Sequence, residues 1–403
     1  MTDLSLSVIV VSRHRSSALM RCIAGLHQQD HPATEVIVVA DPAGVAALEG
    51  SPMKSASFDL ANISAARNLG LSMAAGKVVA FIDDDAVPEP TWASRLVAPF
   101  ADARVVAATG FVRGRNGISY QWRACEVDAT GQDHPMAVPM RGVTLRPGTP
   151  GRAVKTQGTN CAFRATALRA IGGFDPAFQF FLDEADVNLR LALLGLTAIV
   201  PMAQVHHGYL ASDRRRSDRV PLDLTQIAAS TAVFLRRHAP GTLSAGFRHL
   251  AANQRARAIR HMIAGRIEPR DIAGLMTTLC AGWAEGMERD MRTSVPLTSA
   301  AQPFHPLPGL GPRPGTFFAG HKTDHTSLRA RAAEAVAKGQ IVSVLCLSPG
   351  WRRHWHRFDD AGFWLQTGGL WGRAERNGPR PGAVDIAARQ RAESKRLAPF
   401  RPV

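Results

Sequence analysis

The sequence lacks the cysteine pattern of a disulfide-stabilised or zinc-binding protein. Its 403 residues contain five cysteines, and no two of them form a CxxC pair. They are Cys22, Cys125, Cys161, Cys280 and Cys346. An odd number of widely spaced cysteines is typical of a reducing compartment. The sequence therefore argues against a disulfide framework and against a zinc site.

The sequence also lacks the apolar segments that direct a chain to a membrane or anchor it there. The longest apolar stretch, residues 191–205, has 15 residues and is interrupted by Gly195 and Pro201, whereas a membrane-spanning helix needs about 20. The N-terminus begins MTDLSLSVIVVSRHR, with no basic segment before its apolar run, so it does not have the form of a secretory signal. We expect a soluble, cytoplasmic protein.

Acidic residues are scarce in the C-terminal part of the chain. Residues 1–240 contain 24 Lys and Arg against 21 Asp and Glu, a balance of +3, whereas residues 241–403 contain 24 against 12, a balance of +12. This asymmetry favours an anionic neighbour of the C-terminal part, such as membrane lipid head groups or a charged polymer; we expect nucleic acid to be the less suitable partner. The alternative is an arginine-rich surface that only contacts solvent.

The apolar pattern of the first 240 residues predicts an α/β domain with a doubly wound sheet. Apolar, β-branched runs at residues 5–12, 35–39 and 78–82 indicate buried parallel strands, and residues 16–29 and 63–75 have helical spacing. Strands that alternate with helices predict a mostly parallel sheet flanked by helices. In such sheets ligands bind beyond the carboxyl ends of the strands, where Asp41 and the aspartates at 83–85 fall.

Four regions follow from these patterns, and there is no internal repeat. We expect a catalytic domain at residues 1–240, a helical extension at 241–294, a proline-rich linker at 295–320 and a basic, tryptophan-rich region at 321–403. The C-terminal extension is predicted to be largely helical, with one strand at residues 341–347. Its four tryptophans between 351 and 371 are interleaved with arginines. They favour packing of a small domain, with base stacking or a membrane interface as the alternatives.

Three consecutive aspartates, Asp83, Asp84 and Asp85, follow the strand at residues 78–82. Carboxylates so close together repel one another and raise each other's pKa values, and a hard divalent cation such as Mg²⁺ or Mn²⁺ relieves that repulsion. In an extended segment Asp83 and Asp85 point to one side and Asp84 to the other. The alternative for the triplet alone is a solvated acidic turn that caps a helix.

The stretch ISAARNLGLSMAAGKVVAFIDDDAVPEPTW resembles the DxD region of family 2 glycosyltransferases, which have the GT-A fold. The strands SLSVIVVSRHR and EVIVVADPAG are similar to the first two strands of that family, and the resemblance covers residues 5–215. It implies that Asp85 binds the metal, and that the nucleotide contacts lie at Ser12, Asp41, Arg67, Asp83 and Asp84. The family often has two acids after the second strand. Ala40 takes the first of these positions here, and a uridine donor is favoured.

A second acidic group lies in GGFDPAFQFFLDEADVNLRL. On a helix Asp183, Asp186 and Arg190 share a face, which predicts an ion pair between Asp186 and Arg190 and leaves Glu184 pointing elsewhere. Asp186 and Arg190 have either a structural role or a contact with the acceptor. The block resembles the family's GGFD stretch and the acidic motif after it, so Glu184 takes the position of the catalytic base, with Asp183 as the second candidate. Without the resemblance, three acids at a helix start indicate capping.

Two adjacent histidines, His206 and His207, follow a predicted strand. The family resemblance implies that a histidine near this position completes the metal site, and the sequence does not choose between the two. The run Ser212-Asp213-Arg214-Arg215-Arg216 has the composition of a mobile basic loop that closes over a diphosphate. A solvated run of charges is its alternative.

The resemblance, together with the acidic groups, implies an inverting, metal-dependent glycosyltransferase with Mn²⁺ or Mg²⁺ as cofactor. It would move a sugar from a nucleotide-diphosphate donor to an acceptor hydroxyl in polysaccharide or glycolipid synthesis, in the cytoplasm or at the inner face of a membrane. One alternative is a sugar nucleotidyltransferase. It is disfavoured because SRHRSSALM, after the first strand, lacks the glycine of a phosphate loop. The other alternative is a non-catalytic scaffold with the same fold.

Overall fold

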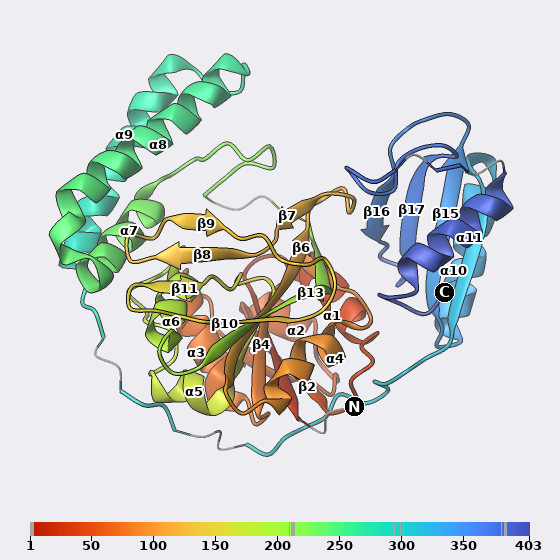
Figure 1. Cartoon of the computed structure of the whole chain (residues 1–403), viewed down its shortest axis with the longest axis horizontal. Helices are drawn as coiled ribbons and strands as arrows, with labels where there is room; N and C mark the ends of the chain where they lie inside the picture. The colour runs from red at the N-terminus through yellow and green to blue at the C-terminus, as the bar shows by residue number, and fades with distance from the viewer. Residues whose placement is uncertain are drawn as a thin grey trace.

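The computed structural model describes residues 4–208, 210, 214–292, 295–298, 300, 302–379, 381–382 and 385–403. A central sheet lies in the middle of the molecule, a pair of helices extends from one end, and a smaller sheet lies at the other end (Figure 1). None of the described helices is long and apolar enough to cross a membrane. Ser212 and Asp213 of the predicted basic loop lie outside the described residues.

The central sheet has the strand order β10-β13-β6-β12-β4-β1-β2-β3, with β5 paired to β13 and β7 paired to β6. The half of the sheet that comes first in the chain is parallel. It consists of β1 (Leu6–Ser12), β2 (Thr34–Ala40), β3 (Lys54–Ser57) and β4 (Val78–Asp83). The helices of this half are α1 (Ser16–Leu26), α2 (Pro42–Ala46) and α3 (Ile63–Met73). The α/β sheet flanked by helices is confirmed, and the predicted strands and helices lie within a few residues of these bounds.

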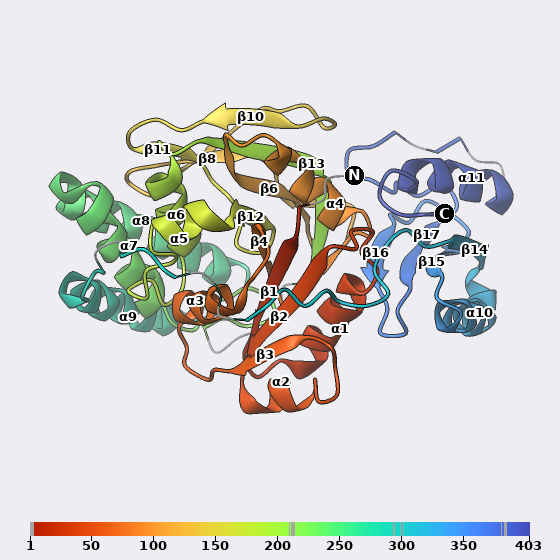
Figure 2. The same cartoon turned by 90° about the horizontal axis from the view of Figure 1, so that it is seen from below.

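The apolar run of β1 is continuous because both faces of the sheet are covered. Val8 and Val10 pack into one core with helices α1 and α4 (Trp92–Val97), and Ile9 packs into the other core with Leu71 of α3. Figure 2 shows α1 and α4 on one side of the sheet and α3 on the other. Helix α3 begins at Asn62, whose side chain accepts a hydrogen bond from the Ala65 backbone N–H, as an N-cap should.

The second half of the sheet mixes strand directions. Strand β12 (Cys161–Arg164) lies antiparallel between β4 and β6 (Val105–Arg113), and β13 (Leu196–His207) is parallel to β6. Short strands complete it: β5 (Ala86–Pro88), β7 (Tyr120–Trp122) and β10 (Thr144–Pro147). A separate small sheet contains β8 (Cys125–Asp128), β9 (Asp133–Pro135) and β11 (Arg152–Val154). Helices α5 (Ala165–Ala170) and α6 (Asp183–Leu191) lie on the α3 side of the central sheet.

Three helices follow the central sheet: α7 (Thr225–His238), α8 (Leu243–Ile263) and α9 (Pro269–Glu288). Helix α7 is buried, whereas α8 exposes most of its length and has Ala258 as its one buried residue. Figure 1 shows α8 and α9 running side by side away from the body of the molecule. The predicted helical extension is therefore present.

The proline-rich stretch after α9 runs along the edge of the catalytic domain. The Leu307 N–H donates to Thr34 O, and the Gly311 N–H donates to Gln29 O. The C-terminal sheet then begins at Gly315, inside the range expected for a linker, with the strands β14 (Gly315–His321), β15 (Ile341–Ser348), β16 (Trp355–Phe358) and β17 (Trp364–Gly369). Helices α10 (His325–Ala337) and α11 (Ile386–Leu397) accompany it. The sequence predicted only the strand that became β15.

The C-terminal sheet contacts the back of the β5–β13 pair. Trp364 and Phe358 pack against Val87 of β5, and buried Arg401 forms an ion pair of 2.8 Å with buried Glu89. This agrees with the packing role expected for Trp364, whereas Trp351 and Trp355 are exposed.

Candidate active site

The aspartate triplet lies where β4 ends and β5 begins, at the carboxyl edge of the parallel strands. Asp83 and Asp85 line a large cavity. Asp84 points the other way and is fully buried, where it accepts a hydrogen bond of 2.7 Å from Ser12 Oγ and pairs with Arg15 at 2.7 Å. The alternation expected for an extended segment is therefore present. Asp84 thus holds the loop after β1, and Ser12 lines the cavity. The nucleotide contacts expected for Ser12 and Asp84 stay predictions.

Strand pairing brings a histidine to these acids. β13 runs antiparallel to β5, and His207 lies opposite Ala86, the residue after Asp85. Its Nε2 is 3.0 Å from Asp85 Oδ1 and 3.9 Å from Asp83 Oδ2. Among the described residues, one group of three His, Cys, Asp or Glu side chains has ligand atoms that all lie within 4.8 Å of one another. It consists of Asp83, Asp85 and His207. These residues can hold a divalent cation, since carboxylates and imidazole together suit a metal such as Mn²⁺.

His206 faces away from this group. Because neighbouring residues of a strand point to opposite faces, its ring lies on the far side of β13, where Nε2 is 2.9 Å from Glu89 Oε1 and the ring packs against Trp364. The geometry thus separates the two histidines that the sequence could not distinguish. His207 lies with Asp83 and Asp85. The prediction that His206 could bind the metal is corrected, because its ring contacts Trp364 of the C-terminal sheet.

A second polar contact orients the His207 ring. Its Nδ1 lies 2.8 Å from Gln121 Oε1 of β7. A proton on Nδ1 that is donated to Gln121 leaves the lone pair of Nε2 directed toward the two aspartates, the arrangement found around metal-ligating histidines. Gln121 was not predicted, because nothing in the irregular pattern of residues 114–151 places it beside residue 207.

The pKa values of the three aspartates are shifted in different directions. Burial raises the pKa of Asp84 to about 7, against the opposing effect of Arg15. Burial likewise raises the pKa of Asp83, which His207 and Arg67 counteract in part. Burial also disfavours the charge on Asp85, but the His207 side chain and the Leu210 N–H outweigh it and hold the pKa of Asp85 well below its usual value. A bound cation would favour the ionised form of Asp83 as well.

Arg67 of α3 lies between the two acidic groups. It forms an ion pair with Asp183, and its Nη2 is 3.8 Å from Asp83 Oδ1. Its guanidinium carbon also lies 5.3 Å from the centre of the Phe174 ring. This buried cation therefore fixes Asp183 in place and leaves it less free to act as a base than Glu184.

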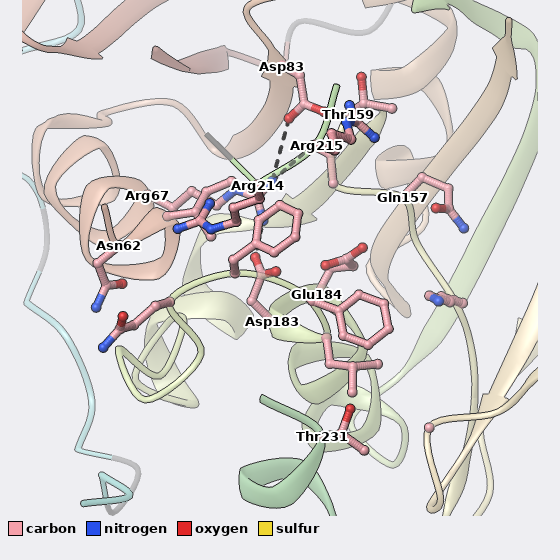
Figure 3. Close-up of a pocket in the computed structure, with 18 of the residues that line it drawn as sticks. Asn62, Arg67, Asp83, Gln157, Thr159, Asp183, Glu184, Arg214, Arg215 and Thr231 are labelled. Carbon is pink, nitrogen blue, oxygen red and sulfur yellow. Dashed lines mark hydrogen bonds and ion pairs between the residues drawn. The ribbon is translucent and has the colours of Figure 1, made fainter. Parts of the chain in front are cut away.

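Glu184 lines the same cavity, and its side chain shares a hydrogen bond with Asp183. Burial opposes its ionisation, but the nearby Lys155 and Arg67 cations outweigh burial and lower the pKa of Glu184. Figure 3 shows Glu184 beside Asp183, with Arg67 and Asp83 bordering the same space. These cations therefore favour the ionised form of Glu184, which is the form that can accept a proton.

Asp186 and Arg190 follow Glu184 on helix α6 but do not line the cavity. The predicted ion pair between them is confirmed, at 2.7 Å. Buried Asp186 also contacts Arg237 and His238 of α7, each at 2.9 Å. Of the two roles left open for these residues, the contacts support the structural one.

Asp41 is buried and does not line the cavity either. Its Oδ1 accepts a hydrogen bond of 2.7 Å from the backbone N–H of His14, a residue that has a positive φ of 57°. Asp41 thus supports the loop that carries Arg13 and Arg15, and its contact with the nucleotide stays a prediction.

The cavity has a volume of 1320 Å³, larger than the 300–1,000 Å³ of ordinary ligand pockets. Its far end is formed by Phe180 and Phe181, by the turn between β8 and β9, and by helix α8. Phe181 and Leu182 have positive φ values of 75° and 63° directly before Asp183, which strains the backbone at this point. No pattern in the sequence indicated that α8 reaches the site.

An α/β sheet with an acid–histidine group at its strand ends and a second carboxylate group in the same cavity is the arrangement expected of a GT-A glycosyltransferase. The sequence adds a family match for this part of the chain. Residues 7–171 match the model of glycosyl transferase family 2. No curated protein matches the sequence.

Several solved structures resemble this one at low sequence identity. One is GalNAc-T7 with UDP, GalNAc and Mn²⁺, at a TM-score of 0.42 and 17% identity; the match covers 59% of this chain and 48% of that one, so it spans about half of that protein. Another is the mannosyltransferase PcManGT from Pyrobaculum calidifontis with GDP-Man and Mn²⁺, at 0.42 and 17%, covering 72% and 88%. A third is S. aureus TarS 1-349, at 0.42 and 15%, covering 71% and 81%. These likenesses are too distant to indicate a substrate.

Proposed function

We propose that the protein is an inverting glycosyltransferase that moves a sugar from a nucleotide-diphosphate donor, with a UDP-sugar favoured, to an acceptor hydroxyl. The observation that supports this most directly is that one cavity is lined both by the metal-binding group, Asp83, Asp85 and His207, and by Glu184. A transferase of this kind needs both a place for the leaving diphosphate and a base for the acceptor.

The donor diphosphate would lie at the acid–histidine group. Asp83, Asp85 and His207 would hold Mn²⁺ or Mg²⁺, which supplies positive charge to the leaving diphosphate when bound. The chain itself contributes Arg15, at the edge of the same cavity and 3.8 Å from Asp85. Arg67 and Arg214 also line the cavity, and they add cations near the phosphates.

Glu184 would take the proton from the acceptor hydroxyl as its oxygen attacks the anomeric carbon. The oxygen approaches from the face opposite the nucleotide, so a single displacement inverts the anomeric centre. The C1–nucleotide oxygen bond breaks, the new C1–oxygen bond forms, and the proton goes to Glu184. Arg67 keeps Asp183 out of this role and Lys155 keeps Glu184 ionised.

The acceptor would belong to a polysaccharide or a glycolipid. The +12 balance of residues 241–403 supports a position at the inner, anionic face of a membrane. The protein would there act as a peripheral enzyme.

The test uses the purified full chain with Mn²⁺ and a panel of nucleotide sugars, and follows the release of nucleoside diphosphate. Slow, metal-dependent release without acceptor is expected, because water can replace the acceptor hydroxyl. Release of pyrophosphate would instead identify a nucleotidyltransferase. Absence of any metal-dependent nucleotide binding would identify a non-catalytic scaffold.

A further inference from the structure

Helix α8 lines the outer end of the cavity with one regular face. The lining residues are Thr242, Ala245, Gly246, His249, Leu250, Asn253 and Gln254. Their spacing of three and four residues is that of a single helix stripe. His249 and Asn253, one turn apart, are joined by a hydrogen bond of 2.8 Å. The cavity therefore continues from Glu184 along a polar face of α8.

The next residues of the same stripe are arginines. Arg257 and Arg260 follow Asn253 at four and seven positions, and Arg257 contacts Gln254. Arg257 also donates to the backbone oxygen of Arg219, which brings the turn at residues 214–219 against the helix. We call Arg215, Arg257, Arg260 and Arg266 the α8 arginine cluster.

No carboxylate neutralises this cluster among the residues that the structure describes. The printed contacts of Arg215 and Arg257 are to backbone oxygens and an amide, and the neighbouring Asp218 pairs with Arg216 at 3.2 Å. Burial and then the charges of Arg215, Arg219 and Arg260 lower the pKa of Arg257. The pKa of His261 is also lowered, by burial and then by the charges of Arg257 and Arg266, against the opposing charge of Asp218. The cations repel one another, and an anion would relieve that repulsion.

We propose that the α8 arginine cluster binds a phosphate group of the acceptor. Guanidinium groups pair with phosphate oxygens in a two-pronged geometry, which makes arginine the residue of choice for such a ligand. Arg215 links the two places, since it belongs to the cluster and also lines the cavity. The inference rests on the proposed glycosyl transfer, because it assigns the phosphate to the molecule that receives the sugar.

The helix sets a length for this acceptor. A helix rises 1.5 Å per residue, so His249 and Arg260 are about 16 Å apart along the axis. An acceptor whose hydroxyl meets Glu184 and whose phosphate meets Arg257 and Arg260 would run along this face of α8, so we expect an extended molecule rather than a single monosaccharide phosphate. Two sources offer that chemistry: a lipid-linked acceptor at a membrane, or a soluble glycan or polyol polymer that carries phosphate.

The experiment compares two double variants of the full chain. Arg257→Ala/Arg260→Ala removes two cations of the cluster. Arg248→Ala/Arg255→Ala removes two exposed arginines that lie seven residues apart on another face of α8. It is the matched control, because it also replaces two arginines of this helix by alanine and lowers the net charge by the same amount. Thermal unfolding of all three proteins verifies that each is folded.

Two probes distinguish the sources. The soluble probe is inorganic tripolyphosphate, and the membrane probe is a vesicle of phosphatidylcholine with phosphatidylglycerol, compared with phosphatidylcholine alone. The cluster variant should bind the relevant probe at least about tenfold more weakly than the control variant, as expected from the loss of a charged hydrogen bond. Selective loss of tripolyphosphate binding indicates a soluble phosphorylated acceptor, and selective loss of vesicle binding indicates a lipid-linked one.

Equal losses in the two double variants, or no binding of either probe by the unmodified protein, would overturn the proposal. Release of nucleoside diphosphate from nucleotide sugars is measured separately on the unmodified protein. If release is absent while the variants still differ in probe binding, the proposed transferase function fails and the phosphate site stands. If release occurs but the variants do not differ, only the phosphate site fails.

Discussion

The molecule contains two groups of three acids, and they use their charges differently. In each group one acid is buried for structure: Asp84 holds Ser12 and Arg15, and Asp186 holds Arg190 and Arg237. The other acids of the first group, Asp83 and Asp85, converge on a histidine. In the second group Arg67 holds Asp183, while Glu184 faces Lys155.

The difference shows how position decides the role of a carboxylate. Asp83 and Asp85 lie beside the His207 imidazole, and their arginine contacts are at 3.8 Å. Their negative charge is therefore not neutralised by a close arginine and can bind a metal ion. Glu184 already has fixed cations nearby, and these keep it ionised without bringing a ligand. The first group is therefore suited to hold a cation, and the second is suited to accept a proton.

The largest effect is expected from Asp85→Ala. The change removes the carboxylate nearest to His207, so metal-dependent nucleotide binding and sugar transfer should both fall to background. Binding of Mn²⁺ is measured by the electron paramagnetic resonance signal of the free ion, and nucleotide binding by calorimetry. Exposed Asp360, which pairs with Arg21, gives the control Asp360→Ala with wild-type values. If Asp85→Ala binds Mn²⁺ as tightly as the unmodified protein, the metal assignment is wrong.

Glu184→Gln should separate binding from chemistry. The amide keeps the size of the side chain but cannot take a proton, so kcat for transfer should fall by about 10²- to 10⁴-fold. Affinity for Mn²⁺ and nucleotide should stay the same. The matched control is Glu126→Gln on β8, a carboxylate that pairs with Arg152 outside the cavity. Transfer by the Glu184→Gln variant at the normal rate would show that another residue is the base.

Asp186→Asn tests the structural acid of the second group. The side chain is completely buried and balances Arg190 and Arg237, so the loss of its charge should lower the free energy of unfolding by about 3 to 5 kcal/mol. Urea unfolding at neutral pH measures the change. The half-exposed Glu126→Gln should change it by less than about 1 kcal/mol. A similar change in both variants would contradict the structural role of Asp186.

The pH dependence of this contribution has a definite sign. Burial opposes the charge of Asp186, but Arg190, His238 and Arg237 outweigh it and hold its folded-state pKa well below the usual value. A depressed carboxylate pKa stabilises the fold above the unfolded pKa and loses that effect as the pH falls toward the folded value. The stability difference between Asp186→Asn and the unmodified protein should therefore shrink in acid.

Local pattern was enough to predict much of the fold and part of the site. The β-branched runs gave the parallel strands, and the alternation of an extended segment separated Asp84 from Asp83 and Asp85. Helical spacing gave the pair Asp186–Arg190. Each of these depends on residues within a few positions of one another.

Features that depend on distant pairing could not be predicted. The choice of His207 over His206 follows from the register of β13 against β5, about 120 residues apart in the chain. Asp41 is the residue expected at the end of a second strand, but the loop after β1 turns its carboxylate toward the His14 N–H. Lys155 and helix α8 reach the cavity only through tertiary packing, and no local motif marks them.

The smallest effect is expected from Lys155→Met, which removes a cation beside Glu184 while keeping a chain of similar length. Lys155 is buried and lies 2.7 Å from Asp133. Its positive charge favours the ionised form of Glu184, so its removal raises the pKa of that carboxylate. The rate of transfer should then begin to fall at a higher pH as the solution is acidified, with little change at alkaline pH. A kcat profile against pH measures the shift, with Arg152→Met, which removes a cation outside the cavity, as the control. An acid limb that stays in place in Lys155→Met would show that Glu184 is not the group that the profile reports.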